Sequence, residues 1–381
     1  MREFRGTHGS CIVYNDDIEY SAIDQIKAFL NSPAFEGQTI RIMPDVHMGK
    51  GAVIGFTSTF DNRIVPNVVG VDISCGVLAC RTDLEFKKDR DFERLDSRVR
   101  ELVPAGFAAH PAQVWREYAT DEEKRVISVG VPALCKKYGI EAAHALNSIG
   151  SMGGGNHYFE VGIDENKNVW MMVHSGSRNF GLQIATYHQN RAHDFHHGVS
   201  QHGLEWLEGP GMQEYLDDSR VASVYAHLSR RIMITRVLES YGEKPRETIE
   251  SVHNYVGEDG IIRKGAISAR AGQRVIIPWN MKDGCIIGTG LGNPDWNFSA
   301  PHGAGRKMGR NEARGKIDLQ YFAKSMRDAH VWTSCVSKET LDEAPQAYKD
   351  SQVIESLLGP TVRVDFHVKP VYNFKAGKEG K

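Results

Sequence analysis

Five short glycine-rich segments constrain the fold of this chain more than any other feature of its sequence. Each segment carries a histidine, cysteine or aspartate and is bordered by a β-like run. The segments are residues 44–51, 70–76, 153–157, 174–181 and 301–306. The bordering runs predict strands at residues 53–60, 77–81, 158–161, 169–173 and 275–277. Strands that end in such loops are a common way to build a site on a rigid sheet, so a site is expected there.

The segments between the glycine-rich loops are predicted to be helical. Apolar residues at three- and four-residue steps between Val221 and Ile232 predict an amphipathic helix within 212–240. Further helices are expected at residues 183–197, at 312–326 and, as two short helices broken near Pro345, at 338–358. The tail, residues 361–374, alternates and predicts strands. Because strands and helices do not alternate regularly, we expect an α+β fold rather than a doubly wound sheet.

The glycine-rich loops span residues 45 to 305, which favours a single domain over residues 1–381. Central β-sheets would carry the active site in the glycine and histidine loops. Residues 85–125, which are charged and irregular in pattern, and residues 183–245 are expected to be peripheral helical insertions.

The composition excludes several classes of protein. With 41% hydrophobic and 25% charged residues, the 381-residue chain is expected to be a well-packed globular protein. Its net charge of −2 argues against a uniformly basic surface but leaves room for a local arginine patch that binds nucleic acid. No apolar run reaches about 18 residues, and the N-terminus lacks a signal-peptide core. Six scattered cysteines without a C-x-x-C pair are interpreted as reduced thiols in a cytoplasmic protein.

A dispersed set of residues has the chemistry of a metal site. Asp72 and Cys75 lie three residues apart in a glycine-flanked turn, and His157, His174 and His253 each follow or end a β-like run. Imidazoles with one carboxylate and one thiolate suit Mn, Fe, Zn or Co better than Mg or Ca. A histidine after a strand can equally be a hydrogen-bonded loop residue, and the spacing alone leaves both interpretations open.

The densest histidine cluster is a weaker candidate for a metal site. It comprises His188, His193, His196, His197 and His202. His193 and His197 would share one helical face because they are four residues apart. The stretch is polar and no glycine loop holds it against a sheet, so we interpret it as a solvated helix face rather than a metal site.

A second group of residues suits phosphate. Residues 150–156 could wrap an anion with backbone N–H groups, whereas no Walker A pattern is present. Arg178, Arg306 and Arg310 add cationic donors, and Arg306 and Arg310 would share one face of a helix beginning near Gly305. The alternative is that these are ordinary surface arginines.

His302 lies among small residues, with Gly303 and Gly305 permitting close approach of a ligand and Arg306 offering donors to phosphate. A histidine held beside a phosphate can be a metal ligand, a general acid or base, or a nucleophile. These residues alone leave all three roles open.

Taken together, the motifs resemble those of the RtcB family of RNA-splicing ligases, come in that family's order and cover nearly the whole chain. The matching segments are Pro44–Gly51 (PDVHMGKG), Val69–Gly76 (VGVDISCG), Gly154–His157 (GGNH), His174–Arg178 (HSGSR), His253–Tyr255 (HNY), Lys264–Gln273 (KGAISARAGQ), His302–Arg306 (HGAGR) and Ala347–Asp350 (AYKD).

The resemblance implies a GTP- and Mn(II)-dependent RNA ligase. Such an enzyme joins an RNA 3′-phosphate or 2′,3′-cyclic phosphate to a 5′-hydroxyl, in tRNA splicing or RNA repair, through a covalent histidine–GMP intermediate. It would make His302 the nucleophile, with Asp45 and Arg178 as further catalytic residues. The implied ligands of two Mn(II) ions are Asp72, Cys75, His157, His174 and His253, with Cys75 bridging. Whether an accessory activator is needed stays open.

The resemblance also implies a guanylate pocket and contacts to RNA. The implied pocket residues are Asn156, Tyr158, Phe159, Glu160, Asn254, Pro278, Trp279, Asn280, Met281, Cys285, Gly303, Ala304, Gly305 and Lys375. The residues expected to hold RNA phosphates are Arg178, Arg306 and Arg310.

The sequence departs from the family's usual pattern at four positions. Trp279 stands where glycine is usual, and Asn280, Cys285 and Pro301 stand where serine is usual. Trp279 is expected to reshape or partly fill the guanylate pocket. This departure motivates an alternative, a manganese-dependent phosphohydrolase that opens cyclic phosphate ends of RNA without ligation. A non-catalytic RNA-end-binding protein is the third interpretation.

Overall fold

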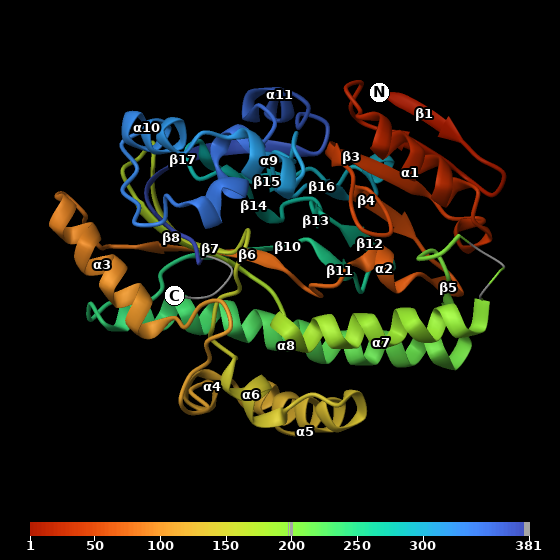
Figure 1. Cartoon of the computed structure of the whole chain (residues 1–381), viewed down its shortest axis with the longest axis horizontal. Coiled ribbons are helices and arrows are strands. Elements are labelled where there is room, and N and C mark those ends of the chain that lie inside the picture. Colours follow the sequence, from red (N-terminus) through yellow and green to blue (C-terminus); the bar gives the residue numbers. More distant parts are fainter. Residues whose placement is uncertain (197, 199–200, 377–381) are drawn as a thin grey trace.

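The computed structural model describes residues 1–196, 198 and 201–376, and two large β-sheets form its framework (Figure 1). The six-stranded sheet runs, in spatial order, β1 (Arg2–Arg5), β2 (Ser10–Val13), β3 (Ile40–His47), β4 (Ile54–Thr59), β12 (Ile261–Lys264) and β11 (Asn254–Val256). The seven-stranded sheet runs β10 (Thr248–Val252), β6 (Gly76–Thr82), β8 (Val169–Ser175), β7 (Tyr158–Asp164), β17 (Val362–Phe374), β15 (Gly284–Gly290) and β14 (Arg274–Asn280). Two ribbons pair β13 (Ala266–Ser268) with β16 (Ser299–Pro301) and β5 (Arg63–Ile64) with β9 (Leu207–Glu208).

Helices surround these sheets. The α-helices are α1 (Tyr20–Leu30), α2 (Pro66–Val69), α3 (Asp89–Leu102), α4 (Trp115–Tyr118), α5 (Asp121–Tyr138), α6 (Ala142–Asn147), α7 (Arg178–His196), α8 (Gly209–Glu239), α9 (Arg310–Lys316), α10 (Leu319–Asp328) and α11 (Ser351–Ser356). Short 3₁₀ turns cover Pro33–Phe35, Pro294–Trp296, Lys338–Glu343 and Pro345–Ala347. In Figure 1, α7 and α8 lie together below the sheets, and α4, α5 and α6 form a further layer outside them.

The seven-stranded sheet curls until its two edge strands meet. The Ile276 amide of β14 donates a hydrogen bond to Ser251 Oγ of β10 over 3.0 Å. Along the sheet's strands, alternate side chains such as Val77 and Met172 pack on the inner side, while Leu78 and Val173 belong to a separate apolar cluster with residues of α8. Both faces are therefore buried, which explains why these strands read as nearly continuous apolar runs.

The predicted mixture of helices and strands is confirmed as α+β. All five predicted strands beside the glycine-rich loops are present, within β4, β6, β7, β8 and β14. The predicted helices at 183–197 and 212–240 are present within α7 and α8. At its end α7 passes outside the described residues, so His197 is not placed.

Several local expectations were wrong. The helix expected at 312–326 is two helices, α9 and α10, because Asp318 caps a new start by accepting from the Tyr321 amide. The tail is one strand, β17, with register shifts, rather than several strands. Within the segment 85–125, which was expected to be a helical insertion, residues 89–102 form helix α3. No helix in the described ranges is both long enough and apolar enough to cross a bilayer.

The packing of α8 differs from the peripheral position expected for residues 183–245. Tyr215, Tyr225 and Arg230 on α8 have no exposed surface, and the helix contacts α5 and α7 as well as strand β8. The segment lies between two layers because the outer helix α5 covers the side that would otherwise face solvent. The single-domain organisation stays a prediction.

Candidate active site

Four neighbouring strands of the seven-stranded sheet bring the dispersed metal-binding candidates to one edge. In the sheet, β10, β6, β8 and β7 lie next to one another in that order. His174 on β8 pairs with Val77 on one side and with Tyr158 on the other, and Val252 pairs with Gly76. Cys75, His157 and His253 directly adjoin these paired positions in the chain. Strand pairing alone therefore gathers residues that are up to 178 positions apart, from 75 to 253.

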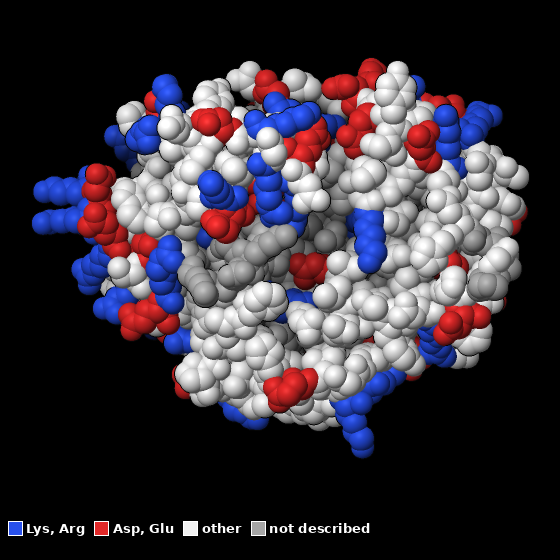
Figure 2. Space-filling model, viewed as in Figure 1, with Lys and Arg blue, Asp and Glu red and all other residues white. Residues whose placement is uncertain are grey.

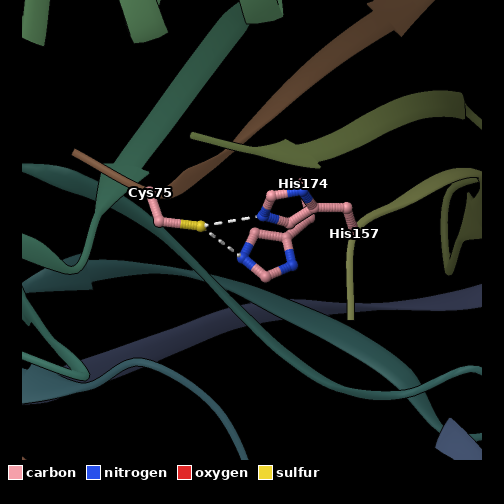
Figure 3. Close-up of side chains that lie close together, drawn as sticks. All are labelled: Cys75, His157 and His174. Carbon is pink, nitrogen blue, oxygen red and sulfur yellow. Dashed lines mark hydrogen bonds between the residues drawn. The ribbon is translucent and has the colours of Figure 1, made fainter. Parts of the chain in front are cut away.

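The side chains converge on one another (Figure 3). Cys75 Sγ lies 3.4 Å from His157 Nε2 and 3.2 Å from His174 Nε2. His174 Nε2 is also 3.2 Å from His253 Nε2, and His157 Nε2 is 3.1 Å from Asp72 Oδ2. Ligand atoms around a tetrahedral ion with bonds of about 2.0–2.3 Å are about 3.3–3.6 Å apart, so the spacing suits a metal ion.

The hydrogen bonds of His174 orient its ring for metal binding. His174 Nδ1 lies 3.1 Å from the Asn156 carbonyl oxygen, which can only accept, so Nδ1 is the donor. In the neutral ring, Nε2 then directs a lone pair toward Cys75 and His253. A carbonyl that fixes the ring in this way is the usual support for a metal-binding histidine.

Burial governs the protonation of this cluster. Desolvation, followed by the nearby imidazoles, holds the pKa values of His174 and His253 well below 6.5, so both rings are neutral. Desolvation and the charge of Asp72 raise the pKa of the Cys75 thiol well above 9.0 in the metal-free protein. Burial opposes ionisation of Asp72, but hydrogen bonding and charge from His157 outweigh it and lower the Asp72 pKa. A cation in this pocket would reverse the penalty on the thiolate.

A buried arginine holds the backbone on both sides of the cluster. Arg230 of α8 is fully buried and donates to the carbonyl oxygens of Ser74, over 2.7 Å, and Ser175, over 2.8 Å. Its Nε pairs with Glu250 Oε1 at 2.6 Å. Burial opposes ionisation of Glu250, but the charge of Arg230 and donation from His227 lower its pKa to about 2. Helix α8 therefore fixes the loops that carry Cys75 and His174.

His302 faces the same cluster from a different wall. Its ring centroid is 4.8 Å from that of His253, and its Nδ1 lies 2.6 Å from Oδ2 of the fully buried Asp45. Because a carboxylate accepts, Nδ1 carries the hydrogen and Nε2 keeps its lone pair. Gly305 has a φ of +75°, and a Cβ there would lie 2.4 Å from the Asp45 carbonyl oxygen. Glycine is required at 305 for the His302 loop to approach β3 this closely.

One cavity of about 820 Å³ contains both walls. This volume is typical of a small-molecule site. Of the fourteen residues expected in a guanylate pocket, those that line the cavity are Asn156, Tyr158, Glu160, Asn254, Pro278, Trp279, Asn280, Met281, Gly303, Ala304, Gly305 and Lys375. Phe159 and Cys285 do not line it. Phe159 belongs to the apolar cluster on the opposite face of β7, since side chains alternate along a strand. Cys285 is buried, with its thiol 3.5 Å from the Met172 sulfur.

Trp279 forms part of the cavity wall rather than its filling. The indole is 4% exposed and packs in an apolar cluster with Ile277 and Ala304. On its other side lies a surface groove of about 780 Å³ that Trp279 also lines. A large side chain at this position is therefore compatible with an open nucleotide-sized cavity.

The floor of the cavity holds a network of buried charges. Lys375 Nζ lies 3.4 Å from Glu343 Oε2 and donates to the Asn156 carbonyl over 3.3 Å. Glu160 accepts a 2.6 Å hydrogen bond from Asn373 Nδ2. Burial raises the pKa of Glu160 to about 7, against the opposing effects of Asn373 and Lys375. Glu160 is therefore poised to change charge near neutral pH.

The three arginines expected to bind phosphates differ in their availability. Arg306 also lines the cavity, but three of its five N–H donors are used within the protein, by Glu343 Oε1 over 3.1 Å, the Asp342 carbonyl and the Met308 carbonyl. Arg310 begins α9, is exposed and lines the cavity, whereas Arg306 precedes that helix. The shared helical face expected for them is therefore wrong.

Arg178 lies beneath the cluster rather than in the cavity wall. Its guanidinium donates to the Gly106 carbonyl and to Ser151 Oγ, and desolvation lowers its pKa. The loop beside it is less open to anions than the sequence suggests. The amides of Gly150, Ser151 and Met152 donate to Ser229 Oγ, the Ser148 carbonyl and the Pro104 carbonyl, respectively. Any anion cradle in this loop therefore begins at Gly153.

Comparison with known proteins identifies the family to which the chain belongs. The model of the family described as "tRNA-splicing ligase RtcB" matches residues 25–376. An "RNA-splicing ligase RtcB" of Escherichia coli strain K12 is 33% identical over 373 residues, covering 87% of this chain and 88% of that protein. The chain belongs to the RtcB family of ligases.

Two further relatives show how wide this family is. "RNA-splicing ligase RtcB1" of Escherichia coli strain ATCC 25922 is 34% identical over 87% of this chain and 88% of its own length. "tRNA-splicing ligase RtcB" of Nanoarchaeum equitans is 27% identical over 81% of this chain and 82% of its own length. The family match over residues 25–376 covers every residue that lines the cavity except Glu19 and Ser21.

The dense histidine cluster between residues 188 and 202 is not the uniformly solvated helix face that we expected. His188 is fully buried and lies 2.8 Å from Asp218 Oδ2, and the His196 ring stacks on Trp206. His193 instead lies beside His202 and Glu205. The segment around His202 and Glu205 packs against α7. The histidines that the sequence pattern placed on one polar face therefore have different surroundings.

Three further cavity residues escaped the sequence analysis. Lys264 is buried, and desolvation lowers its pKa to about 7. His47 donates from Nδ1 to the Asp45 carbonyl, behind the partner of His302. Both lie in motifs quoted above, so their sequence signal was available. Glu343 comes from an ordinary-looking 3₁₀ turn, and no sequence signal marks it.

Proposed function

We propose that this protein is a GTP- and Mn(II)-dependent RNA ligase that joins a 3′-phosphate or 2′,3′-cyclic phosphate end to a 5′-hydroxyl end. The observation that carries the proposal is the placement of a buried cluster of one thiol and several imidazoles opposite His302 within one cavity. Membership of the RtcB family supports the ligase class. The end chemistry, nucleotide and metal are the parts that remain to be measured.

The donor set fits two divalent ions of the manganese type. Asp72, Cys75, His157, His174 and His253 provide one carboxylate, one thiol and three imidazoles, and these side chains would hold the ions. When bound, such ions would neutralise the negative charge that develops on the reacting phosphates. The protein's own part is to keep His174 and His253 neutral by burial, to orient the His174 ring through the Asn156 carbonyl and to hold the Cys75 loop through Arg230.

His302 is the proposed nucleophile. Its Nε2 lone pair would attack the α-phosphorus of GTP, forming an N–P bond as the bond to the pyrophosphate oxygen breaks and pyrophosphate leaves. The ring gains positive charge as this bond forms, and the carboxylate of Asp45, 2.6 Å from Nδ1, would stabilise it. Asp45 also fixes the tautomer that leaves Nε2 free of a proton.

Two further transfers complete the proposed reaction. An oxygen of the RNA 3′-phosphate would attack the guanylate phosphorus, and the N–P bond to His302 breaks. The 5′-hydroxyl oxygen would then attack the 3′-phosphorus, releasing GMP and losing its proton to solvent or base. Arg306 and Arg310, which line the cavity, are the proposed partners of RNA phosphates, whereas the buried Arg178 would support the loop behind the cluster through Gly106 and Ser151.

The proposed guanine contacts lie on the cavity floor. Glu160 offers a carboxylate that suits the adjacent N–H donors of guanine, and Lys375 offers a cation beside it. On the face drawn in Figure 2, Lys and Arg are interspersed with Asp and Glu, and no broad field of one sign covers that face. We therefore propose that the enzyme recognises RNA ends and backbone rather than a long sequence. We place it in the cytoplasm, where its six buried thiols would stay reduced.

The test is transfer of label from α-³²P-labelled GTP to the protein, followed by ligation of a 3′-phosphate RNA to a 5′-hydroxyl RNA. We expect an acid-labile, base-stable adduct in the wild-type protein with Mn(II), and no adduct in His302→Ala. The matched control is His144→Ala, an exposed histidine on α6, which should be labelled normally. Undiminished labelling of His302→Ala would contradict the assignment of the nucleophile.

The second candidate is a manganese-dependent phosphohydrolase that opens cyclic phosphate ends without joining them. Trp279 motivates it because a large side chain stands where the family usually has glycine, although the cavity beside the indole stays large enough for a nucleotide. The same reactions separate the two functions, because a phosphohydrolase would yield opened 3′ ends with Mn(II) but neither labelled protein nor joined RNA. RNA binding without either product, and independent of metal, would instead indicate a non-catalytic RNA-end binder.

A further inference from the structure

A second histidine cluster lies away from the cavity, where α7 ends and the chain turns toward β9. His193 Nδ1 lies 2.6 Å from Glu205 Oε1, and His202 Nδ1 lies 3.4 Å from the same oxygen. The ligand-capable atoms of these three residues all lie within 4.8 Å of one another. None of the three lines the cavity that holds His302.

The carboxylate at the centre of this cluster is held from behind. Glu205 is 1% exposed, and its Oε2 accepts hydrogen bonds from the Gly203 amide, over 2.7 Å, and from Gln189 Nε2, over 3.1 Å. These donors leave Oε1 directed at the two imidazoles. The carboxylate is thus oriented before any ligand arrives, as in a built metal site.

Hydrogen bonds and histidines, rather than lysine or arginine, stabilise this buried carboxylate. Among the ion pairs of the described residues, Glu205 takes part only in those with His193 and His202, and no lysine or arginine pairs with it. A buried carboxylate normally requires a full opposite charge. Histidine supplies one only when protonated, whereas a divalent cation supplies it while both rings stay neutral.

We propose that His193, His202 and Glu205 form a second metal site, distinct from the catalytic cluster, for a divalent cation of the zinc type. Two imidazoles and one carboxylate suit Zn²⁺, and three protein ligands leave a fourth position for water. The 3.4 Å separation of His202 Nδ1 and Glu205 Oε1 matches the spacing of about 3.3 Å expected around a tetrahedral ion with 2.0 Å bonds, whereas the 2.6 Å hydrogen bond between His193 and Glu205 would have to lengthen when the ion binds. His202 is 86% exposed, so the ion can enter from solvent.

The ion would tie the end of α7 to the segment that leads into α8. His193 belongs to α7, whereas His202 and Glu205 precede β9 and α8. Helix α8 carries Arg230, which holds the backbone beside Cys75 and His174. The role that follows is structural, a cross-link between two long helices beneath the sheets (Figure 1).

The experiment counts ions in tag-free, chelator-treated full-length protein titrated with Zn²⁺ alone and with Co²⁺ alone. We expect the wild-type protein to bind one ion more than His202→Ala, or to bind that ion at least tenfold more tightly. The control His144→Ala should match the wild type. Because His202 is exposed, its replacement leaves the fold intact and a loss of binding is interpretable.

Cobalt separates this site from the cavity. A thiolate-to-cobalt charge-transfer band reports on Cys75, so Cys75→Ala should lose the band yet keep the additional ion, and His202→Ala should show the reverse. Zinc at a hundredfold excess over its Kd should also raise the Tm of the wild type by about 3 °C more than that of His202→Ala. Equal stoichiometry, affinity and Tm shift in the wild type and His202→Ala would overturn the proposal.

Discussion

The two histidine clusters of this protein are assembled in opposite ways. The cluster around Cys75 gathers residues on or beside four neighbouring strands, together with Asp72, and its cysteine and histidines are buried. The second cluster comes from one short stretch, residues 193–205, and opens to solvent through His202. Histidines that are close together in the sequence therefore form the exposed cluster. The buried cluster forms from residues that are far apart in the sequence and are brought together by strand pairing. The difference predicts that the buried cluster governs chemistry and that the exposed cluster affects only stability.

The largest expected effect is that of Cys75→Ala, which removes a ligand from the buried cluster. If the ions supply several kcal/mol of transition-state stabilisation, RNA joining should fall at least about 10³-fold. The measurement is ligation rate together with bound manganese. Cys80→Ala is the matched control, since Cys80 lies on β6, the strand that directly follows Cys75, with its side chain in a separate apolar cluster, and should keep activity. Comparable losses of ligation rate in Cys75→Ala and Cys80→Ala would contradict a specific role for Cys75.

Asp45→Asn should have the next largest effect, because it preserves shape but removes the charge beside His302. Labelling by GTP should slow by about 10²–10³-fold, while manganese binding stays unchanged. Pre-steady-state labelling measures the first quantity and metal analysis the second. Asp17→Asn, on an exposed residue, is the control. Loss of manganese binding in Asp45→Asn would contradict this prediction, because it would mean that metal binding at the Cys75 cluster depends on the contact between Asp45 and His302.

The affinity for GMP should depend on pH through Glu160. Burial raises the Glu160 pKa to about 7, so the carboxyl is mostly neutral at pH 6 and mostly ionised at pH 8. Guanine donors prefer the ionised form, so the Kd for GMP should decrease by about tenfold over this range. Titration calorimetry at several pH values measures it. Glu160→Gln should abolish the pH dependence, and Glu258→Gln, on an exposed residue, should retain it.

The smallest effect on chemistry is expected from His202→Ala. With saturating manganese and GTP, its ligation rate should stay within about twofold of the wild type, because surface substitutions away from the site change stability by only about 0.5 kcal/mol. Steady-state ligation at 25 °C is the measurement. A large loss of rate would mean that the exposed cluster communicates with the cavity through α7 and α8.

Much of the framework was accessible from the sequence because it depends on local pattern. Apolar runs beside glycine loops predicted β4, β6, β7, β8 and β14, and apolar periodicity predicted α8. The predictions were wrong where a single side chain changes the local structure or where the strand sets the direction of a side chain. Asp318 caps a new helix and divides the expected segment 312–326, and Phe159 turns away from the cavity because its strand alternates.

The candidate site was predictable only in part. Residue types and their glycine context indicated Asp72, Cys75 and the three histidines as possible ligands, and the family resemblance assigned their roles. Availability was not predictable: Arg306 is committed to Glu343, a residue with no sequence signal. Likewise, Arg230 was seen only as part of a helix, although it anchors the loops of the metal cluster.

The sequence by itself determined which residues carry chemistry and which local elements present them, because side-chain type and short-range periodicity are local properties. Only the tertiary structure decided which of these residues meet. Pairing of β10, β6, β8 and β7 brought one dispersed set together, and the fold-back after α7 brought Glu205 to His193. The reason is physical: burial and hydrogen bonding between distant segments set protonation and access, and neither is encoded at any single position.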